Sequence, residues 1–154
     1  MSSKLFTSSF IKVCVANFFL FSTLYAFLPV TPFEYNEVMN SQGYAGWHLY
    51  LAFIIGLIAG GPFHNFIIEN YSRKKTTFFT YLAVILPIVL MIGTTNALLC
   101  LAGLFVQGAA FGLATASSIT VAIDVTLPSR RGKGNIIYAW AVRLVMVLTI
   151  PLSI

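Results

Sequence analysis

The sequence predicts an all-α membrane protein with five transmembrane helices and its N-terminus in the cytoplasm. The first observation is composition: 58% of the 154 residues are hydrophobic and only 8% are charged, whereas soluble proteins carry about 25% charged residues. The second is that five apolar segments each approach the ~20 residues that cross a bilayer. The third is that the basic residues gather in connections on one side of the membrane. Because lipid offers no partner for free backbone N–H and C=O groups, these segments are expected to be helices.

The first two helices are predicted over residues 13–30 and 46–68. The first, VCVANFFLFSTLYAFLPV, follows two lysines and ends beside a proline. It is longer than the apolar core of a secretory signal, and no small-residue cleavage site closes it, so it is interpreted as an uncleaved membrane helix. The second helix runs without a charge until Glu69.

The other three helices are predicted over residues 76–94, 97–123 and 136–154. Pro87 in the third and Pro151 in the fifth are expected to kink their helices, which membrane helices tolerate when neighbours satisfy the freed carbonyl. The fourth contains no charged residue, and the fifth is still apolar where the sequence stops.

The orientation follows from the basic residues, because cytoplasmic loops carry an excess of Lys and Arg. Eight of the nine basic residues fall on the side of the N-terminus: Lys4, Lys12, Arg73, Lys74, Lys75, Arg130, Arg131 and Lys133. The opposite connections, over residues 31–45 and 95–96, contain no basic residue and two acids, Glu34 and Glu37. The N-terminus is therefore predicted to be cytoplasmic.

Small residues mark helix faces that a neighbouring helix can approach closely. Gly56 and Gly60 form one G-x-x-x-G motif, and Gly108 and Gly112 form another. Such motifs favour close helix contact in lipid, where burial from water no longer drives association. The alternative is that they reflect only the general abundance of small residues in membrane helices.

The distribution of polar residues argues against several other classes of function. Short basic clusters between apolar runs are typical of membrane-flanking charge, so no nucleic-acid partner is expected. Cys14 and Cys100 each lie inside an apolar run and are interpreted as packing residues. No motif or metal-ligand spacing links them to His48 or His64, so an intramembrane enzyme, a metal site and a cofactor are not expected.

The stretch GPFHNFIIENYSRKK, residues 61–75, gathers four charges within seven positions. Glu69 is predicted to end the second helix, and Arg73 is close enough to fold back and pair with it. Lys74 and Lys75 would lie at the level of the lipid headgroups. The alternative is that all three basic residues only set the topology.

This stretch resembles the signature loop of the major facilitator superfamily of secondary transporters, which reads roughly G-P-L-x-G-x-x-x-D-R-x-G-R-R. Gly61 and Pro62 match its opening, and Arg73 and Lys74 match its final basic pair. Glu69 keeps the charge of the family's aspartate. The departures are Asn65 and Ser72 in place of two glycines and Asn70 in place of an arginine.

Two further stretches resemble the same family. The segment FIKVCVANFFLFSTLYAFLPVTPF looks like its first helix, and LPSRRGKGN, with Arg131 and Gly132, looks like its connection between the fourth and fifth helices. Asp124 falls where the family has an acid that pairs with the loop arginine. The resemblance thus implies a charge cluster of Glu69, Arg73 and Asp124 that latches the two halves of the transporter in the outward-open state.

The resemblance implies that residues 1–154 are an incomplete N-terminal half of this fold, a partial helix bundle. The sixth helix and the C-terminal half of the same transporter are expected as missing partners, so the chain is interpreted as a fragment that does not transport alone. The implied activity is secondary transport of a small solute by alternating access, with efflux of the sugar or drug type. An antiporter of the drug/proton kind is poorly supported, because Leu104, Ala141 and Ile150 replace residues of its motifs. The alternative function is a small non-transporting membrane protein that assembles through its glycine-rich helix faces.

Polar residues within the spans are candidates for a substrate cavity, since they are costly in lipid. They are Asn17, Tyr25, Gln107 and Arg143. Arg143 either faces a cavity or extends to the inner headgroups. Asn17 and Gln107 either contact substrate or join helices by hydrogen bonds.

The expected partners are the lipid bilayer and an unidentified small-molecule substrate, with possible proton or ion coupling. No Asp or Glu lies in the middle of a predicted helix, so a coupling acid would belong to the missing half. His64 is interpreted as a hydrogen-bonded structural residue rather than a proton carrier. The expected location is the inner membrane of a bacterium.

Overall fold

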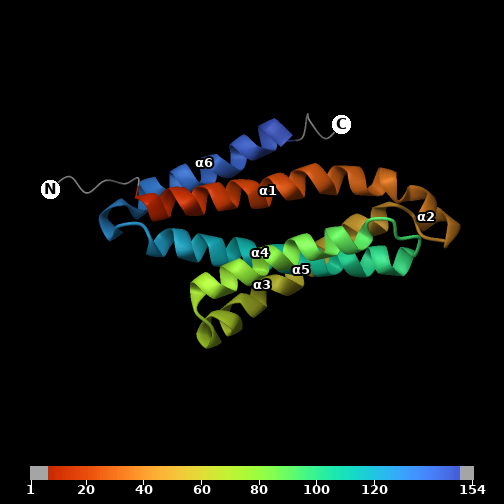
Figure 1. Cartoon of the computed structure of the whole chain (residues 1–154), viewed down its shortest axis with the longest axis horizontal. Coiled ribbons are helices and arrows are strands. Elements are labelled where there is room, and N and C mark those ends of the chain that lie inside the picture. The colour runs from red at the N-terminus through yellow and green to blue at the C-terminus, as the bar shows by residue number, and fades with distance from the viewer. Residues whose placement is uncertain (1–6, 150–154) are drawn as a thin grey trace. The chain divides into compact units, whose positions relative to one another are not determined.

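The computed structural model describes residues 7–149, apart from the side chains of Asn65, Ile68, Glu69, Arg73 and Lys74. Within this part the regular structure is entirely helical, which confirms the predicted all-α class (Figure 1). The helices are α1 (Ser8–Glu34), α2 (Asn36–Ser41), α3 (Trp47–Asn70), α4 (Arg73–Met91), α5 (Ala97–Asp124), the 3-10 turn η1 (Pro128–Arg130) and α6 (Arg131–Thr149).

Three of the described helical segments are long and apolar enough to cross a membrane: Ser8–Glu34, Trp47–His64 and Ala97–Asp124. A fourth, Lys75–Met91, is apolar but shorter. These segments agree with the predicted membrane class. The number of five spans and the cytoplasmic position of the N-terminus stay predictions, and Pro151 and Ile150 lie outside the described residues.

Most helix ends lie beyond the apolar segments from which their limits were predicted, but α4 ends at Met91 rather than at residue 94. α1 continues through Pro29 and Pro32 to Glu34 rather than ending near residue 30. Proline has a φ that suits a helix and withdraws only its own N–H, so two prolines near a helix end leave few carbonyls without a donor. α3 and α4 likewise include the polar residues at their ends, because hydropathy marks the lipid-immersed part of a helix and not its last turns.

The chain forms two compact units. Among the described residues, one unit holds residues 7–27 and 118–149, and the other holds residues 28–117. Each is described by itself below.

The core of the second unit is the contact between α3 and α5, in which the two glycine motifs face each other. A Cβ at Gly56 would overlap the carbonyl of Phe105, and one at Gly60 would overlap the backbone of Ala109. On the opposite side, a Cβ at Gly108 would overlap the carbonyl of Phe53. The two backbones approach this closely only because the glycines have no side chain. The prediction of close helix contact is therefore confirmed.

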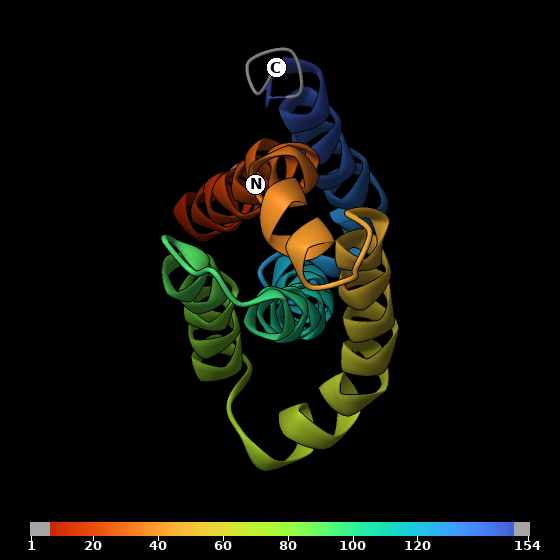
Figure 2. The same ribbon diagram turned by 90° about the vertical axis from the view of Figure 1, so that its right-hand side faces the viewer.

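α4 packs against the same central helix, and Figure 2 shows α5 between α3 and α4. The hydroxyls of Thr77 on α4 and Ser117 on α5 lie 3.0 Å apart and share a hydrogen bond. Polar pairs of this kind join helices in lipid.

A short polar segment closes the end of this unit at which α5 begins. Gln42, just after α2, donates from Nε2 to the carbonyl of Thr95 at 2.7 Å and accepts at Oε1 from the N–H of Ala97 at 3.0 Å. Tyr35 donates its hydroxyl to the carbonyl of Met91 at 2.7 Å. Burial raises the pKa of Tyr35, which keeps the hydroxyl protonated as a donor. These bonds join the residues around α2 to the connection between α4 and α5.

The other unit is held by contacts between the end of α5 and α6. The Tyr138 hydroxyl donates to Ser118 Oγ at 2.8 Å, and both residues are buried. A Cβ at Gly134 would lie 2.8 Å from Cγ2 of Thr126, so the start of α6 also fits closely against the residues that follow α5.

Candidate functional site

Gln107 is a buried amide in the middle of an apolar helix. It lies ten residues after Ala97 on α5, about 15 Å along the axis at ~1.5 Å per residue. The side chain is fully buried, and neither Nε2 nor Oε1 has a hydrogen-bond partner within the described part of the chain. Leu104 and Phe111, one turn away on each side, are also buried, so this face of α5 points into the protein. A buried amide with both atoms unsatisfied is rare and requires an explanation.

Asn17 on α1 is in the same condition. It lies nine residues after Ser8, about 14 Å along the helix, and it is fully buried. Both atoms of its amide also have no partner among the residues that the structure describes. Leu20 and Leu24, farther along α1, are buried as well. Asn17 and Gln107 belong to different units, and each is located here on its own helix.

The two other predicted cavity residues differ from these amides. Tyr25 is half-buried, and its ring centroid lies 6.1 Å from that of Phe21 on the same helix. Arg143 is exposed on α6, and its guanidinium carbon lies 5.5 Å from the ring centroid of Trp140. A guanidinium at this distance from an indole face is stabilised by a cation–π interaction. The choice between a cavity and the headgroups for Arg143 stays open.

The predicted signature loop is largely helical. Gly61 and Pro62 lie inside α3, which continues to Asn70, and only Tyr71 and Ser72 separate it from α4. Ser72 occupies the N-cap position of α4, and its carbonyl accepts the N–H of Thr76 at 3.0 Å. The side chains of Asn65, Glu69, Arg73 and Lys74 lie outside the described residues, so the predicted ion pair stays a prediction.

Each charged residue of the predicted cluster lies at a helix end where the helix dipole disfavours its charge. Glu69 is in the last turn of α3 and Asp124 is the last residue of α5, where the helix dipole disfavours acids. Arg73 begins α4, where the dipole disfavours bases. Ion pairing with opposite charges offsets this cost, whereas a charge that only sets the topology leaves it uncompensated.

The second matched connection begins where α5 ends. η1 leads into α6, whose first two residues are Arg131 and Gly132. Both are exposed, and a Cβ at Gly132 would meet nothing within 4 Å. The structure therefore shows no close approach that requires glycine at this position.

The sequence model of the Major Facilitator Superfamily matches residues 13–154. The chain belongs to the Major Facilitator Superfamily. It is thus a multi-pass integral membrane protein of a transporter family, and the resemblance inferred from the sequence is confirmed. Comparisons with curated proteins and with solved structures gave no match.

Membership of the superfamily and the packing of α3 against α5 both argue against a protein that assembles with other copies through its glycine-rich helix faces. Both motifs of this superfamily member are occupied within one chain, Gly60 against Ala109 and Gly108 against Phe53. They are therefore not free to join a second copy while this fold persists. Sequence reasoning did not identify Gln42, whose two hydrogen bonds reach residues more than 50 positions away, because no local pattern marks such a contact.

Proposed function

We propose that the chain contributes to secondary transport of a small polar solute by alternating access, with efflux of the sugar or drug type. The helices supply one side of a site near the middle of the membrane, and a second half supplies the other. The N-terminus and the basic connections face the cytoplasm, and the membrane is the inner membrane of a bacterium. Proton or ion coupling accompanies transport.

The observation that carries this proposal is the unsatisfied amide of Gln107. An amide held in an apolar span without a partner costs about 1–3 kcal/mol. A hydroxyl- or amine-bearing solute that binds there would recover this free energy through hydrogen bonds. Asn17 on α1 supports the same interpretation independently. We therefore assign solute contact to Gln107 and Asn17.

The direct test uses a cysteine at position 143. We propose that Arg143 faces the same water-filled cavity, so in the intact transporter without its native cysteines Arg143→Cys is expected to react with a water-soluble thiol reagent. Ethidium and a radiolabelled sugar represent the two solute classes, and the one that is transported should slow the labelling. Leu144→Cys, on the neighbouring exposed position, is the control that should face lipid and react slowly. Equal labelling at both positions would contradict the cavity assignment.

We further propose that Glu69, Arg73 and Asp124 form the latch between the inner helix ends. The support is the resemblance of these positions to the signature of the superfamily whose model matches residues 13–154. Arg73→Ala is expected to slow transport about tenfold while insertion into the membrane stays normal, and Arg73→Lys is expected to retain most activity. Transport assays alongside a surface-labelling measure of insertion test this. Unchanged transport by Arg73→Ala would indicate that the basic residues only set the membrane topology.

His64 is the proposed carrier if the coupling ion is a proton. Its Nε2 is buried in α3 without a hydrogen-bond partner within the described residues. The earlier interpretation of His64 as a hydrogen-bonded structural residue therefore lacks support at this atom. An imidazole can both accept and release a proton at its ring nitrogens.

A further inference from the structure

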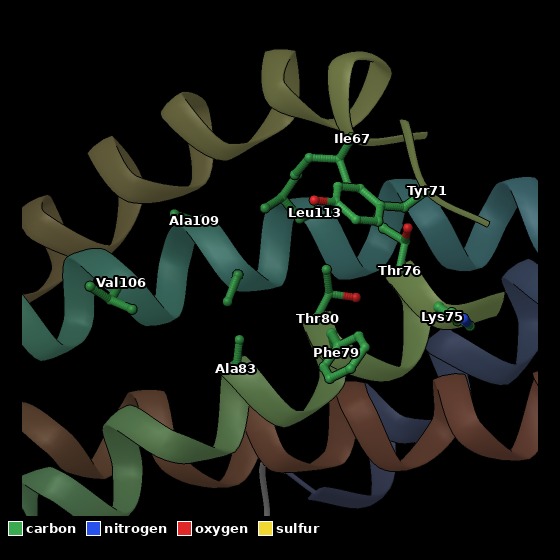
Figure 3. A pocket seen from close by; sticks show the side chains of 11 residues that line it. Ile67, Tyr71, Lys75, Thr76, Phe79, Thr80, Ala83, Val106, Ala109 and Leu113 are labelled. Atoms are coloured by element: carbon green, nitrogen blue, oxygen red, sulfur yellow. The ribbon is translucent and has the colours of Figure 1, made fainter. Parts of the chain in front are cut away.

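A groove with a volume of about 700 Å³ opens in the second unit (Figure 3). It lies between the end of α3, the first half of α4 and the middle of α5. Ile67, Phe79, Val106 and Leu113 provide much of its wall, and alanines such as Ala83 leave the space between them. Pockets that bind small molecules typically measure 300–1,000 Å³, so the groove is large enough for a ligand.

The interior of the groove requires an apolar occupant. The hydroxyl of Thr76 donates to the carbonyl of Ser72 at 3.2 Å, and that of Thr80 donates to the carbonyl of Thr77 at 3.0 Å. Both threonine hydroxyls of the wall thus donate to carbonyls of their own helix. A polar ligand would lose its water there and gain little in exchange.

One end of the groove is positively charged. Lys75 lines it from the first turn of α4, is exposed, and has no carboxylate partner among the side chains that the structure describes. The first N–H groups of α4 have no acceptor within the helix, and the helix dipole adds positive potential at this end. A ligand that fits the whole groove is therefore apolar along its length and anionic at one end.

We propose that this groove binds an anionic phospholipid. One acyl chain lies along the apolar wall from Phe79 to Ala83, and the headgroup phosphate lies at Lys75 and the start of α4. Basic residues beside a membrane helix lie at the headgroup level, where anionic lipids concentrate. The site is separate from the buried amide of Gln107 and does not depend on the proposed transport function.

The test compares two lipids with the same acyl chains, dioleoylphosphatidylglycerol and dioleoylphosphatidylcholine, on the full chain in mild detergent. Native mass spectrometry counts the bound lipid. The anionic lipid is expected to bind more tightly, and Lys75→Gln is expected to reduce its affinity about fivefold without changing that of the zwitterionic lipid. Lys133→Gln removes an exposed lysine from the first turn of α6 and should change neither. Equal affinity for both lipids, or equal effects of the two lysine variants, would overturn the proposal.

A second pair of variants tests the acyl-chain part. Ala83→Phe fills the groove and is expected to weaken binding of both lipids, whereas Leu82→Phe, at an exposed neighbouring position, should leave binding unchanged. Inorganic phosphate at the same concentration should not displace the lipid. Displacement by phosphate would show a simple anion site, and unchanged binding by Ala83→Phe would show that another element covers the groove.

Discussion

Gly60→Ala is expected to lower the stability of the protein, although alanine is the better helix former. A methyl group at Gly60 would overlap the backbone of Ala109 on α5, and a backbone cannot move aside as a flexible side chain does. Overpacking of this kind costs about 1–3 kcal/mol. The gain in helix propensity from glycine to alanine is about 1 kcal/mol. Over most of its range, the cost of overpacking is larger than this gain. Separation of α3 from α5 would also loosen the face that holds Gln107.

The adjacent glycine provides the matched control. A Cβ at Gly61 would meet nothing within 4 Å, so Gly61→Ala is expected to leave stability unchanged or to raise it by up to about 1 kcal/mol. Thermal unfolding of both variants in the same detergent, followed by circular dichroism, gives the comparison. If the two substitutions have the same effect, the contact between α3 and α5 does not contribute to stability as described.

Gln107→Met is expected to raise stability while the affinity for the transported solute falls. Methionine has nearly the shape of glutamine but carries no amide, so the substitution removes a buried polar group that has no described partner. Stability should rise by about 1–3 kcal/mol, the cost of such an unsatisfied group. The affinity for the transported solute should fall about tenfold, because a hydrogen bond to the ligand is lost. Opposite changes in stability and function are expected where a protein keeps a destabilising residue for its activity.

The same substitution at a satisfied glutamine is the control. Gln42 holds Thr95 and Ala97 by two hydrogen bonds, so Gln42→Met is expected to cost about 1–2 kcal/mol and to leave solute affinity unchanged. Unfolding midpoints in detergent and transport by the intact transporter in proteoliposomes measure the two properties. Destabilisation by Gln107→Met would mean that this amide forms hydrogen bonds between helices and is not available to bind a solute.

The sequence by itself determined that the chain is an all-α membrane protein and to which family it belongs. Transfer of a side chain to lipid is a property of single residues, so hydropathy located the apolar parts of α1, α3, α4 and α5 without knowledge of their neighbours. The family followed from three stretches together: the loop with Gly61 and Arg73, the first helix, and the connection at residues 127–135. The match over residues 13–154 confirmed it.

Only the tertiary structure decided which faces of these helices meet. In lipid, apolar helices gain little from one another by burial, so partner choice depends on shape and on hydrogen bonds between distant residues. The sequence showed that Gly60 and Gly108 permit close approach, but not that they pack against Ala109 and Phe53. It named Gln107 as a candidate and gave no sign that Gln42 forms hydrogen bonds to distant residues. The structure separated them, because one has its hydrogen bonds within the chain and the other has none that is described.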